Sequence, residues 1–495
     1  MKGRLMRACG ITLCIFLLLA GFAAAETAQI RYVVVFEGNH VPENAADTIA
    51  SAGGRFVKAL RGVGVAIAIS DNPGFPDVLV TMPGILSVSR EGSRTIEKAK
   101  TTRSHLSSPL PSDSLLDAQW NIRRVKADRA WHITSGSHNT IVAVIDSGIA
   151  WNHPDLKSNV IYAACFKSNQ ELGTVTCNCT YQGPGTFKCP SECPCSPYPD
   201  LEPHGTNVAG VIAAAFGGGH IVGVAPHVAL ASYNTAEVTA VIDGIPVIEA
   251  PDSSVWEAML DAAERGFQVI NLSLGDTINK RADAGTFDAW NMVVQAVLAQ
   301  GSTIVASAGN EGVNLDRNIV HIPAQLPGVI SVAGTGIRPL PFYPQNGAFD
   351  VLSTINVVKC NAQDPTVCTV PELFTNFGKS IDLVAPGGDC GPDSFFDFAN
   401  FVQICDERYL ILTTDAFPLD PQCAAKAKCE TGYFSQIGTS FAAPHVSAAA
   451  ALVLDRHPHL SPQQVSEIIN STAEGIGDRV LFGNGMLDVF SAVNR

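Results

Sequence analysis

The stretch that most constrains the fold runs from Gln436 to Leu454 and reads QIGTSFAAPHVSAAAALVL. Its alanine-rich part favours a helix, and since it has almost no polar face, that helix must be buried on every side. Pro444 falls in the first turns, where a missing N–H group costs least. Such a helix requires a large core and places Ser440 at its positive N-terminal end. Taken alone, this stretch favours the interpretation that Ser440 only caps the helix.

The chain is long and apolar enough to provide this core. It has 495 residues, of which 46% are hydrophobic, and this length allows two or three domains. The formal net charge of −14 is the opposite of what a phosphate-binding surface needs, so we expect no nucleic-acid partner.

The N-terminus has the pattern of a targeting segment. Three basic residues precede an apolar run from Ile11 to Ala20, and three alanines follow at 23–25. This pattern predicts a secretory signal peptide over residues 1–25 and a secreted mature protein with no membrane span. The alternative is a membrane anchor, but the run is short for a span.

Twelve cysteines remain after the signal, in two groups of six, over residues 165–195 and 360–429. In a secreted protein these two cysteine-rich insertions predict disulfides, whose pairing the sequence does not reveal. The alternative for the first group is a zinc cluster, although its spacing lacks the common CxxC pairs.

Residues 26–95 predict a small α+β domain. We expect strands at 30–37, 63–69 and 85–89 and helices at 45–52 and 75–82. Residues 96–118 are polar and predict a linker that a protease can cut.

Residues 119–495 alternate strands with helices, which predicts a doubly wound parallel α/β sheet with helices on both faces. We expect strands at 141–145, 228–233, 269–274, 303–306, 329–333 and 381–384, and helices at 204–216, 255–265 and 286–298. In such folds ligands bind outside the carboxyl ends of the strands.

Polar residues suited to acyl transfer occur at these strand ends. Asp146 follows the strand IVAVI, and Asn310, whose amide can donate to an oxyanion, ends IVASAGN. His204 opens a helix, where the positive helix end favours the neutral imidazole that a general base requires. Singly, each is explained as a turn residue or a surface histidine. With Ser440 they supply an acid, a base, a nucleophile and an oxyanion donor.

The ordered motifs VAVIDSG, HGTNVAG, SAGN and GTSFAAPHVS resemble the signature motifs of the subtilisin-like serine proteases, the subtilases or peptidase family S8. IDLVAPG and GNGMLDVFSAV also match, so the resemblance covers residues 119–493. It implies that Asp146 is the triad acid, His204 the base, Ser440 the nucleophile and Asn310 the oxyanion side chain. Polypeptides are then the substrates, and the chemistry requires no cofactor.

The same resemblance implies a substrate cleft and a ferredoxin-like propeptide. The stretch 272–275 resembles the family strand that pairs with an extended substrate, and residues 26–95 resemble an intramolecular chaperone and inhibitor. The enzyme itself would cut between Lys98 and Gln119. The residues expected to bind substrate are Leu272, Ser273, Leu274, Gly275, Ser307, Ala308, Gly309 and His321.

The chain departs from the family pattern at several positions. Asn207 replaces a second histidine, and Pro203 replaces a residue that is often glycine before the base. His321 falls at the base of the primary specificity pocket, and we hypothesise that it changes the depth and charge of that pocket. Asp155 matches a calcium ligand, but Gly217 stands where an amide ligand is expected, so structural calcium is a possibility to test.

Insertions at 165–195 and 237–251 are expected near the cleft, either as a rim that narrows substrate choice or as surface loops without a specific role. We therefore expect a secreted, monomeric, self-processing endopeptidase. The alternatives are a catalytically silent binding or adhesion module and an esterase on the same fold.

Overall fold

A computed structural model describes residues 29–96, 113–199, 201–242, 245–317, 319–339, 348–352, 359–361, 364–369, 375–391, 395–397, 402–416 and 430–495. The predicted signal peptide and most of the predicted linker lie outside these residues. Within the described part, no helix combines the length and the hydropathy that crossing a membrane requires.

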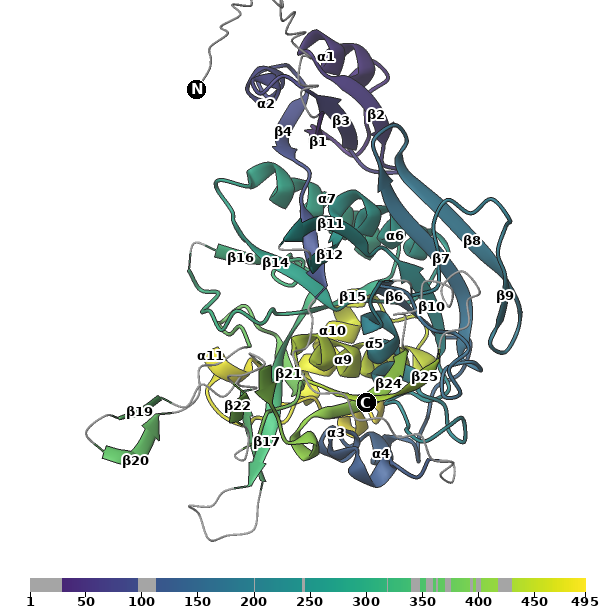
Figure 1. Cartoon of the computed structure of the whole chain (residues 1–495), viewed down its shortest axis with the longest axis vertical. Coiled ribbons are helices and arrows are strands. Elements are labelled where there is room, and N and C mark those ends of the chain that lie inside the picture. Colours follow the sequence, from purple (N-terminus) through teal and green to yellow (C-terminus); the bar gives the residue numbers. More distant parts are fainter. Residues whose placement is uncertain are drawn as a thin grey trace, which may run out of the picture.

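An antiparallel sheet with two helices forms the N-terminal domain at the top of Figure 1. The strand order β2-β3-β1-β4 and the chain order βαββαβ are those of a ferredoxin-like domain, which confirms the predicted α+β class. The edge strand β2 was not predicted. The elements are β1 (Ile30–Phe36), α1 (Ala45–Ser51), β2 (Arg55–Ala59), β3 (Val65–Ser70), α2 (Phe75–Leu79) and β4 (Ile85–Arg90).

The large sheet of the second domain has the order β18-β17-β15-β13-β6-β10-β7-β8-β9, with β21 also paired to β17. Its central pairs are parallel, which confirms the doubly wound fold. The strands at its centre are β6 (Ile141–Asp146), β10 (Ala229–Asn234), β13 (Val269–Leu272), β15 (Thr303–Ser307), β17 (Ile330–Pro339) and β21 (Leu383–Pro386).

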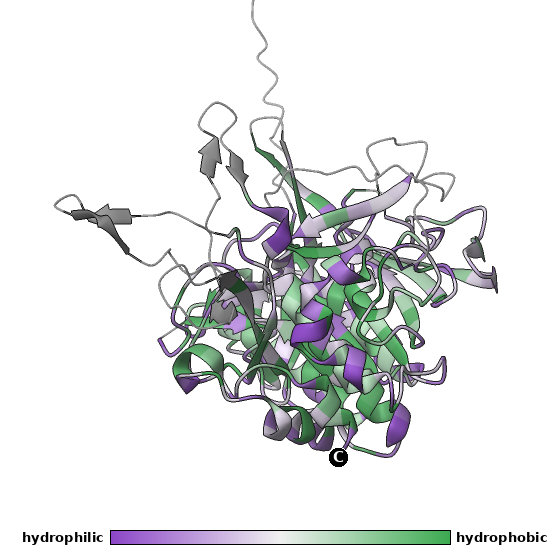
Figure 2. Cartoon of the chain, turned by 90° about the horizontal axis from the view of Figure 1, so that it is seen from below, coloured by the Kyte–Doolittle hydropathy of each residue, from purple (hydrophilic) through white to green (hydrophobic). Residues whose placement is uncertain are grey.

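Helices cover both faces of this sheet, as predicted. In β6, Val142 and Val144 join the apolar cluster of α5 (His204–Ala213) and α9 (Thr439–Arg456). The alternating residues of β6 join the other cluster, with α6 (Asp252–Glu264) and α7 (Ala284–Ala299). Residues 439–454 of α9 are all buried, and apolar residues fill the middle of the domain in Figure 2.

The first cysteine-rich insertion extends the large sheet at one edge. It forms β7 (Val160–Asn169), β8 (Gly173–Gly183) and β9 (Thr186–Lys188), a long hairpin that reaches toward the N-terminal domain in Figure 1. Its six cysteines pair as Cys165–Cys195, Cys177–Cys193 and Cys179–Cys189, so the disulfide prediction is confirmed and the zinc alternative is wrong. In the second group, Cys390 pairs with Cys405.

A separate sheet joins the two domains, in the order β11-β12-β5-β14-β16. Its middle strand, β5 (Ser93–Ile96), is the end of the N-terminal domain. The others are β11 (Glu237–Ile242), β12 (Ile245–Pro251), β14 (Leu274–Asn279) and β16 (Ile319–Ile322). The insertion at 237–251 is therefore a hairpin that widens this sheet.

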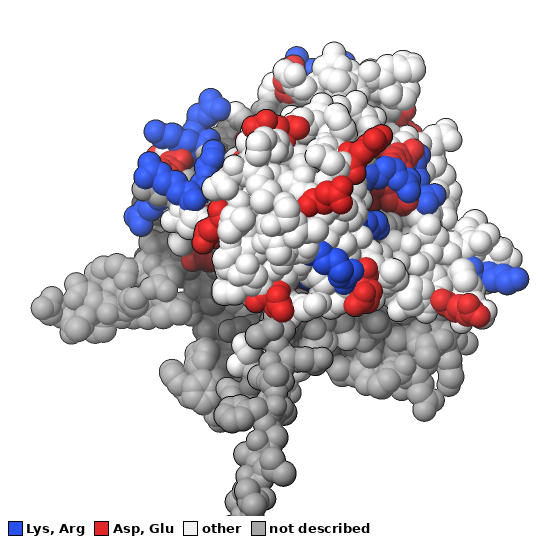
Figure 3. Space-filling model, turned by 90° about the horizontal axis from the view of Figure 1, so that it is seen from above, with Lys and Arg blue, Asp and Glu red and all other residues white. Residues whose placement is uncertain are grey.

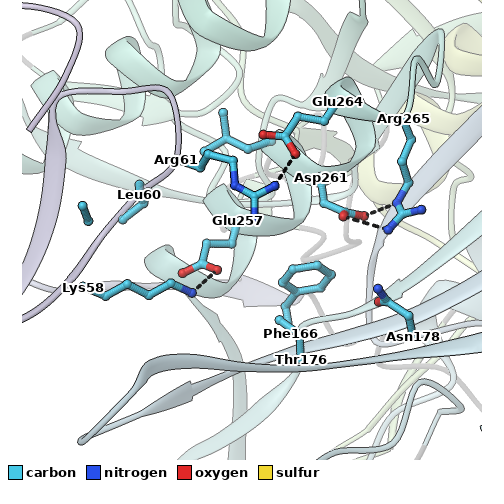
Figure 4. Close-up of a pocket in the computed structure, with 12 residues that line it drawn as sticks. Lys58, Leu60, Arg61, Phe166, Thr176, Asn178, Glu257, Asp261, Glu264 and Arg265 are labelled. Carbon is cyan, nitrogen blue, oxygen red and sulfur yellow. Dashed lines mark hydrogen bonds and ion pairs between the residues drawn. The ribbon is translucent and has the colours of Figure 1, made fainter. Parts of the chain in front are cut away.

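The N-terminal domain rests on α6 and α7. Val33, Val35 and Ile67 share an apolar cluster with these two helices. Around this contact, Lys58 Nζ lies 2.6 Å from Glu257 and Arg61 Nη1 lies 2.7 Å from Glu264, beside a pocket of about 640 Å³ (Figure 4). The face seen in Figure 3 is mostly uncharged, with acidic side chains spread over it and several basic side chains gathered at its left edge.

The remaining elements are η1 (Leu116–Ala118), α3 (Trp120–Arg124), α4 (Ala127–Ala130), β18 (Ala348–Leu352), β19 (Lys359–Asn361), β20 (Asp364–Thr369), β22 (Phe395–Asp397), β23 (Val402–Ile404), η2 (Glu407–Tyr409), β24 (Ile411–Ala416), β25 (Thr431–Gln436), α10 (Pro462–Thr472), α11 (Arg479–Phe482) and α12 (Val489–Val493).

Candidate active site

Asp146 and His204 meet at the carboxyl edge of the large sheet. Asp146 is the last residue of β6 and is fully buried, and its Oδ1 accepts a hydrogen bond from the Ser147 N–H at 2.7 Å. His204 is the first residue of α5, and its Nδ1 lies 3.0 and 2.9 Å from the two Asp146 oxygens. A Cβ at Gly205 would lie 2.5 Å from the Gly148 oxygen and 3.1 Å from the Asp146 Cβ, so only glycine permits this approach.

Ser440 lies in the first turn of α9, and its side chain does not cap the helix. The capping position is Gly438, and the Ser440 hydroxyl donates instead to the Ser273 main-chain oxygen at 3.2 Å. The interpretation of Ser440 as an N-cap is therefore wrong. The next residue, Phe441, places its ring 5.6 Å from the His204 imidazole. His204 and Ser440 thus come from the first turns of the neighbouring helices α5 and α9.

Asn310 points its amide at the same turn. Its Oδ1 accepts from the Thr439 N–H at 2.9 Å, which leaves the NH₂ group directed toward Gly438, where a Cβ would lie 3.4 Å from Nδ2. The preceding Gly309, at φ +96°, donates its N–H to the Thr439 hydroxyl at 3.2 Å. Thr439 was not singled out in the sequence, although it stands next to Ser440.

The stretch from Ser307 to Gly309 holds Asn310 against the sheet. Ser307 ends β15, Ala308 donates to the Val332 oxygen at 2.9 Å, and the Ala308 oxygen accepts from Asn376 at 2.8 Å. The structure therefore gives these expected substrate-binding residues a positioning contact with Asn376.

His321 lies where the specificity pocket is expected. A Cβ at Gly275 would collide with its Nε2, and a Cβ at Gly309 would lie 2.5 Å from its Cε1, so the imidazole sits between the two stretches expected to bind substrate. Nδ1 lies 3.3 Å from the Thr277 hydroxyl and 3.8 Å from Glu311, while Nε2 has no hydrogen-bond partner in the described part of the chain. Burial lowers the pKa of His321 to about 4, so the ring is neutral near pH 7.

The stretch 272–275 lies beside Ser440 and divides into two parts. Leu272 is a core residue at the end of β13, and the Ser273 hydroxyl donates to the Ser440 oxygen at 2.8 Å. Leu274 and Gly275 pair antiparallel with Ile96 and Thr95 of β5. The strand expected to bind a substrate therefore binds an extended segment of its own chain.

Asp155, the expected calcium ligand, is held through Oδ2, while its buried Oδ1 has no hydrogen-bond partner in the described part of the chain, so calcium at this residue stays a prediction. Its Oδ2 accepts hydrogen bonds from the Tyr433 hydroxyl at 2.7 Å and the His220 N–H at 3.2 Å, whereas calcium needs six to eight oxygen ligands. Among the described residues, no group of three or more histidine, cysteine, aspartate or glutamate side chains could hold a metal. Burial raises the pKa of Asp155.

The two departures from the family pattern beside His204 are accommodated within the fold. Pro203 occupies the capping position of α5. Asn207 is buried, donates to the Thr414 oxygen at 2.6 Å and to Asp415 at 2.9 Å, and accepts from Gln436 at 3.1 Å. Asn207 therefore ties α5 to the hairpin of β24 and β25.

Comparisons with known proteins agree with this geometry. The model of the subtilase family matches residues 137–486. Subtilisin DY from Bacillus licheniformis is 27% identical over 377 residues, which are 75% of this chain and 97% of that protein. Subtilisin E from Bacillus subtilis (strain 168) is 25% identical over 477 residues, which are 95% of this chain and 92% of that protein.

Solved structures share the fold over most of the chain. The epidermin leader peptide processing serine protease of Staphylococcus aureus is 21% identical with a TM-score of 0.62, covering 94% of this chain and 98% of that one. Fervidolysin from Fervidobacterium pennivorans is 20% identical with a TM-score of 0.62, covering 94% of this chain and 61% of that one. Since the family model spans well over half of the sequence, this chain belongs to the subtilase family of serine proteases.

Proposed function

We propose that this chain is a secreted endopeptidase that hydrolyses peptide bonds through Asp146, His204 and Ser440 and matures by cutting itself. The observation that carries the proposal is the contact of 2.9 Å between His204 Nδ1 and Asp146, at a sheet edge that also holds Ser440 and Asn310. Because the carboxylate engages Nδ1, Nε2 is the nitrogen that takes the serine proton.

In the proposed reaction, the Ser440 oxygen attacks the peptide carbonyl carbon while His204 accepts its proton. The tetrahedral oxyanion is stabilised by the Asn310 NH₂ group and the Ser440 N–H, both at the positive end of α9. The imidazolium then protonates the leaving amine. Water, deprotonated by His204, hydrolyses the acyl-enzyme and restores Ser440.

The position of β5 supports an inhibitory role for the N-terminal domain. This strand occupies the groove between β12 and β14 and ends at Ile96, opposite Leu274 and next to Ser273. A chain segment in this place excludes any substrate from the same groove. We place the self-processing cut in the linker that begins after Ile96, and we infer export from the signal-like residues 1–25 and the disulfides.

The test follows chain length during export. Wild type is expressed beside Ser440→Ala, with Ser471→Ala, an exposed serine of α10, as the matched control. We expect wild type and Ser471→Ala to lose the N-terminal domain and Ser440→Ala to retain it, as measured by mass spectrometry.

Two other outcomes count against the proposal. If all three proteins fold and stay full length, self-processing is refuted and the binding or adhesion module gains support. If all three are shortened alike, another protease makes the cut, and hydrolysis of an unfolded protein by wild type but not by Ser440→Ala then decides the activity.

A further inference from the structure

Arg94 of β5 is buried against a single carboxylate of the catalytic domain. Its side chain is 4% exposed, and Nε and Nη2 donate to Oδ1 and Oδ2 of Asp252 at 2.8 and 3.1 Å. Asp252 is fully buried at the first position of α6, and its Oδ1 also accepts from the Trp290 indole N–H at 2.8 Å. This is the forked geometry that distinguishes arginine from lysine at a carboxylate.

Arg94 belongs to a strand that lies in the substrate groove. Thr95 pairs with Gly275 and Ile96 pairs with Leu274, so the next partner along the groove is Ser273, whose oxygen accepts from the Ser440 hydroxyl. A substrate residue opposite Ser273 lies next to the nucleophile and supplies the carbonyl of the scissile bond. Counting away from that bond, the partners Ser273, Leu274 and Gly275 face the first, second and third residues, and Arg94 holds the fourth place.

The alternation along β5 supports this numbering. Arg94 and Ile96 are buried and Thr95 is exposed, as expected when every second side chain of an extended strand faces the protein. Ile96 joins the apolar cluster that also contains Leu274 and Ala250. The groove therefore has an apolar subsite for the second residue and a carboxylate subsite for the fourth.

We propose that Asp252 is a specificity-determining residue and that the enzyme prefers polypeptides with arginine four residues before the cleaved bond and an apolar residue two before it. The inference rests on the proposed function and names its substrate class. When β5 leaves the groove, Asp252 retains only the Trp290 N–H among the partners described above. A substrate arginine restores the lost pair, whereas a neutral or acidic residue leaves a buried carboxylate without a cation, which is costly.

Lysine is expected to be intermediate. It supplies the charge but lacks the fork that reaches both oxygens of Asp252. The size of the arginine preference follows from the penalty for leaving one partner of a buried charge pair unpaired. At the lower end of that penalty, we expect kcat/KM to fall about thirtyfold when alanine replaces arginine at the fourth position.

The experiment uses the mature wild-type enzyme. A digest of an unfolded proteome, mapped by mass spectrometry, gives the residue frequencies before each cut and an accepted residue at the first position. Peptides that share this residue and differ only at the fourth position then carry arginine, lysine, alanine or glutamate. We expect arginine to be enriched in the digest and kcat/KM to fall in that order.

Asp252→Asn tests the carboxylate directly, since its amide oxygen can still accept from Trp290. The expected preference of this variant for the arginine peptide over the alanine peptide falls below about threefold. Asp261→Asn is the matched control, because Asp261 binds Arg265 through two nitrogens, at 2.7 and 3.1 Å, on the same helix but away from β5. This control keeps the preference.

Each contrary result has a distinct meaning. Equal cleavage of the arginine and alanine peptides by wild type overturns the specificity assignment and leaves the protease proposal standing, even if Asp252→Asn fails to fold. A preference that survives in Asp252→Asn also overturns it. If wild type cleaves neither peptides nor unfolded protein, the proposed function fails and this inference fails with it.

Discussion

Two regions meet at Ser440 and are built in opposite ways. The sheet edge with Asp146, His204 and Asn310 is complete within the catalytic domain, and its side chains are held by near neighbours. The five-stranded sheet beside it takes its middle strand from the N-terminal domain. The edge with Asp146, His204 and Asn310 is formed when the domain folds. In the five-stranded sheet, β5 must leave before another extended segment can take its place.

This difference separates reactivity from selectivity. Main-chain pairing with β14 and β12 accepts almost any sequence, so discrimination has to come from the pockets that receive alternate side chains. His321 and Asp252 lie on this side, whereas the edge with Asp146, His204 and Asn310 departs from the family motifs only beside His204, at Pro203 and Asn207. Changes in the two regions should therefore affect different kinetic constants.

The largest expected effect is a fall in kcat when Asn310 is replaced. Asn310→Ala removes one donor to the oxyanion and should lower kcat by about 10²- to 10³-fold, the loss that such a removal causes in subtilisin, with KM nearly unchanged. Steady-state kinetics of the matured protein measure both constants. Asn139→Ala, at an exposed asparagine, should match wild type. A rise in KM at constant kcat would instead place Asn310 in substrate recognition.

The next largest effect concerns the expected specificity pocket around His321. His321→Gly removes the imidazole between Gly275 and Gly309 and should change the relative kcat/KM of small and large residues before the cleaved bond by about 10- to 200-fold. A peptide series varied at that position measures it, with His459→Gly as a surface control. An unchanged preference would refute the hypothesis that His321 shapes this pocket.

Measuring stability as a function of pH tests whether the buried histidines are neutral. Burial lowers the pKa of His153, His321 and His445 to about 4, from an ordinary value of 6.5. Between these values the unfolded chain binds more protons than the folded chain, so stability rises with pH and is lost as pH falls from about 6.5 toward 4. Urea unfolding of Ser440→Ala between pH 7 and 4.5 measures this slope.

Substituting one histidine isolates its part of that slope. Burial also raises the pKa of Asp155, Glu311 and Asp382, which opposes the trend. His445→Gln should therefore show a shallower loss of stability with acid than its parent, while His459→Gln should not. Parallel slopes for all three proteins would contradict a neutral buried His445.

The smallest expected effect is the loss of stability when the ion pairs between the N-terminal domain and α6 are removed. The side chains of Lys58 and Glu257 are 34% and 12% exposed, and those of Arg61 and Glu264 are 81% and 38% exposed. In full-length Ser440→Ala, Arg61→Gln should cost at most a few tenths of a kcal/mol and Lys58→Gln somewhat more, both less at high salt. The free energy of unfolding of each variant is measured in urea, with hydrogen exchange of the β5 amides as the probe. An equal loss of unfolding free energy in the two variants would show that burial does not determine how much each ion pair stabilises the protein.

The reacting edge could be located from the sequence because its residues follow regular elements. Asp146 ends a continuous apolar strand, His204 opens a helix, and the buried helix after Ser440 has an unmistakable composition. These signals are local, so one chain suffices to read them. The assigned catalytic roles remain predictions that the experiments above test.

The recognition side could not be predicted in the same way. Strand β5 is a short polar stretch, and the partner that makes Arg94 a buried residue lies 158 positions away. The edge strand β2 carries Arg55 and Lys58, and β8 alternates cysteines with exposed polar residues, so neither has a clear apolar period. Their pairing depends on tertiary neighbours and disulfides, which a linear pattern does not contain.

The hairpin of β7 and β8 connects the N-terminal domain to the disulfides of the first cysteine-rich insertion. At its tip, the main-chain oxygens of Asn169 and Gly173 accept from Arg31 of β1, and at its base Asn234, beside Asp146 in the sheet, donates to the Ser196 oxygen at 2.9 Å. Three disulfides lie between these ends. Without these disulfides the hairpin would keep only its strand pairing, so we expect a reducing environment to weaken its contact with the N-terminal domain.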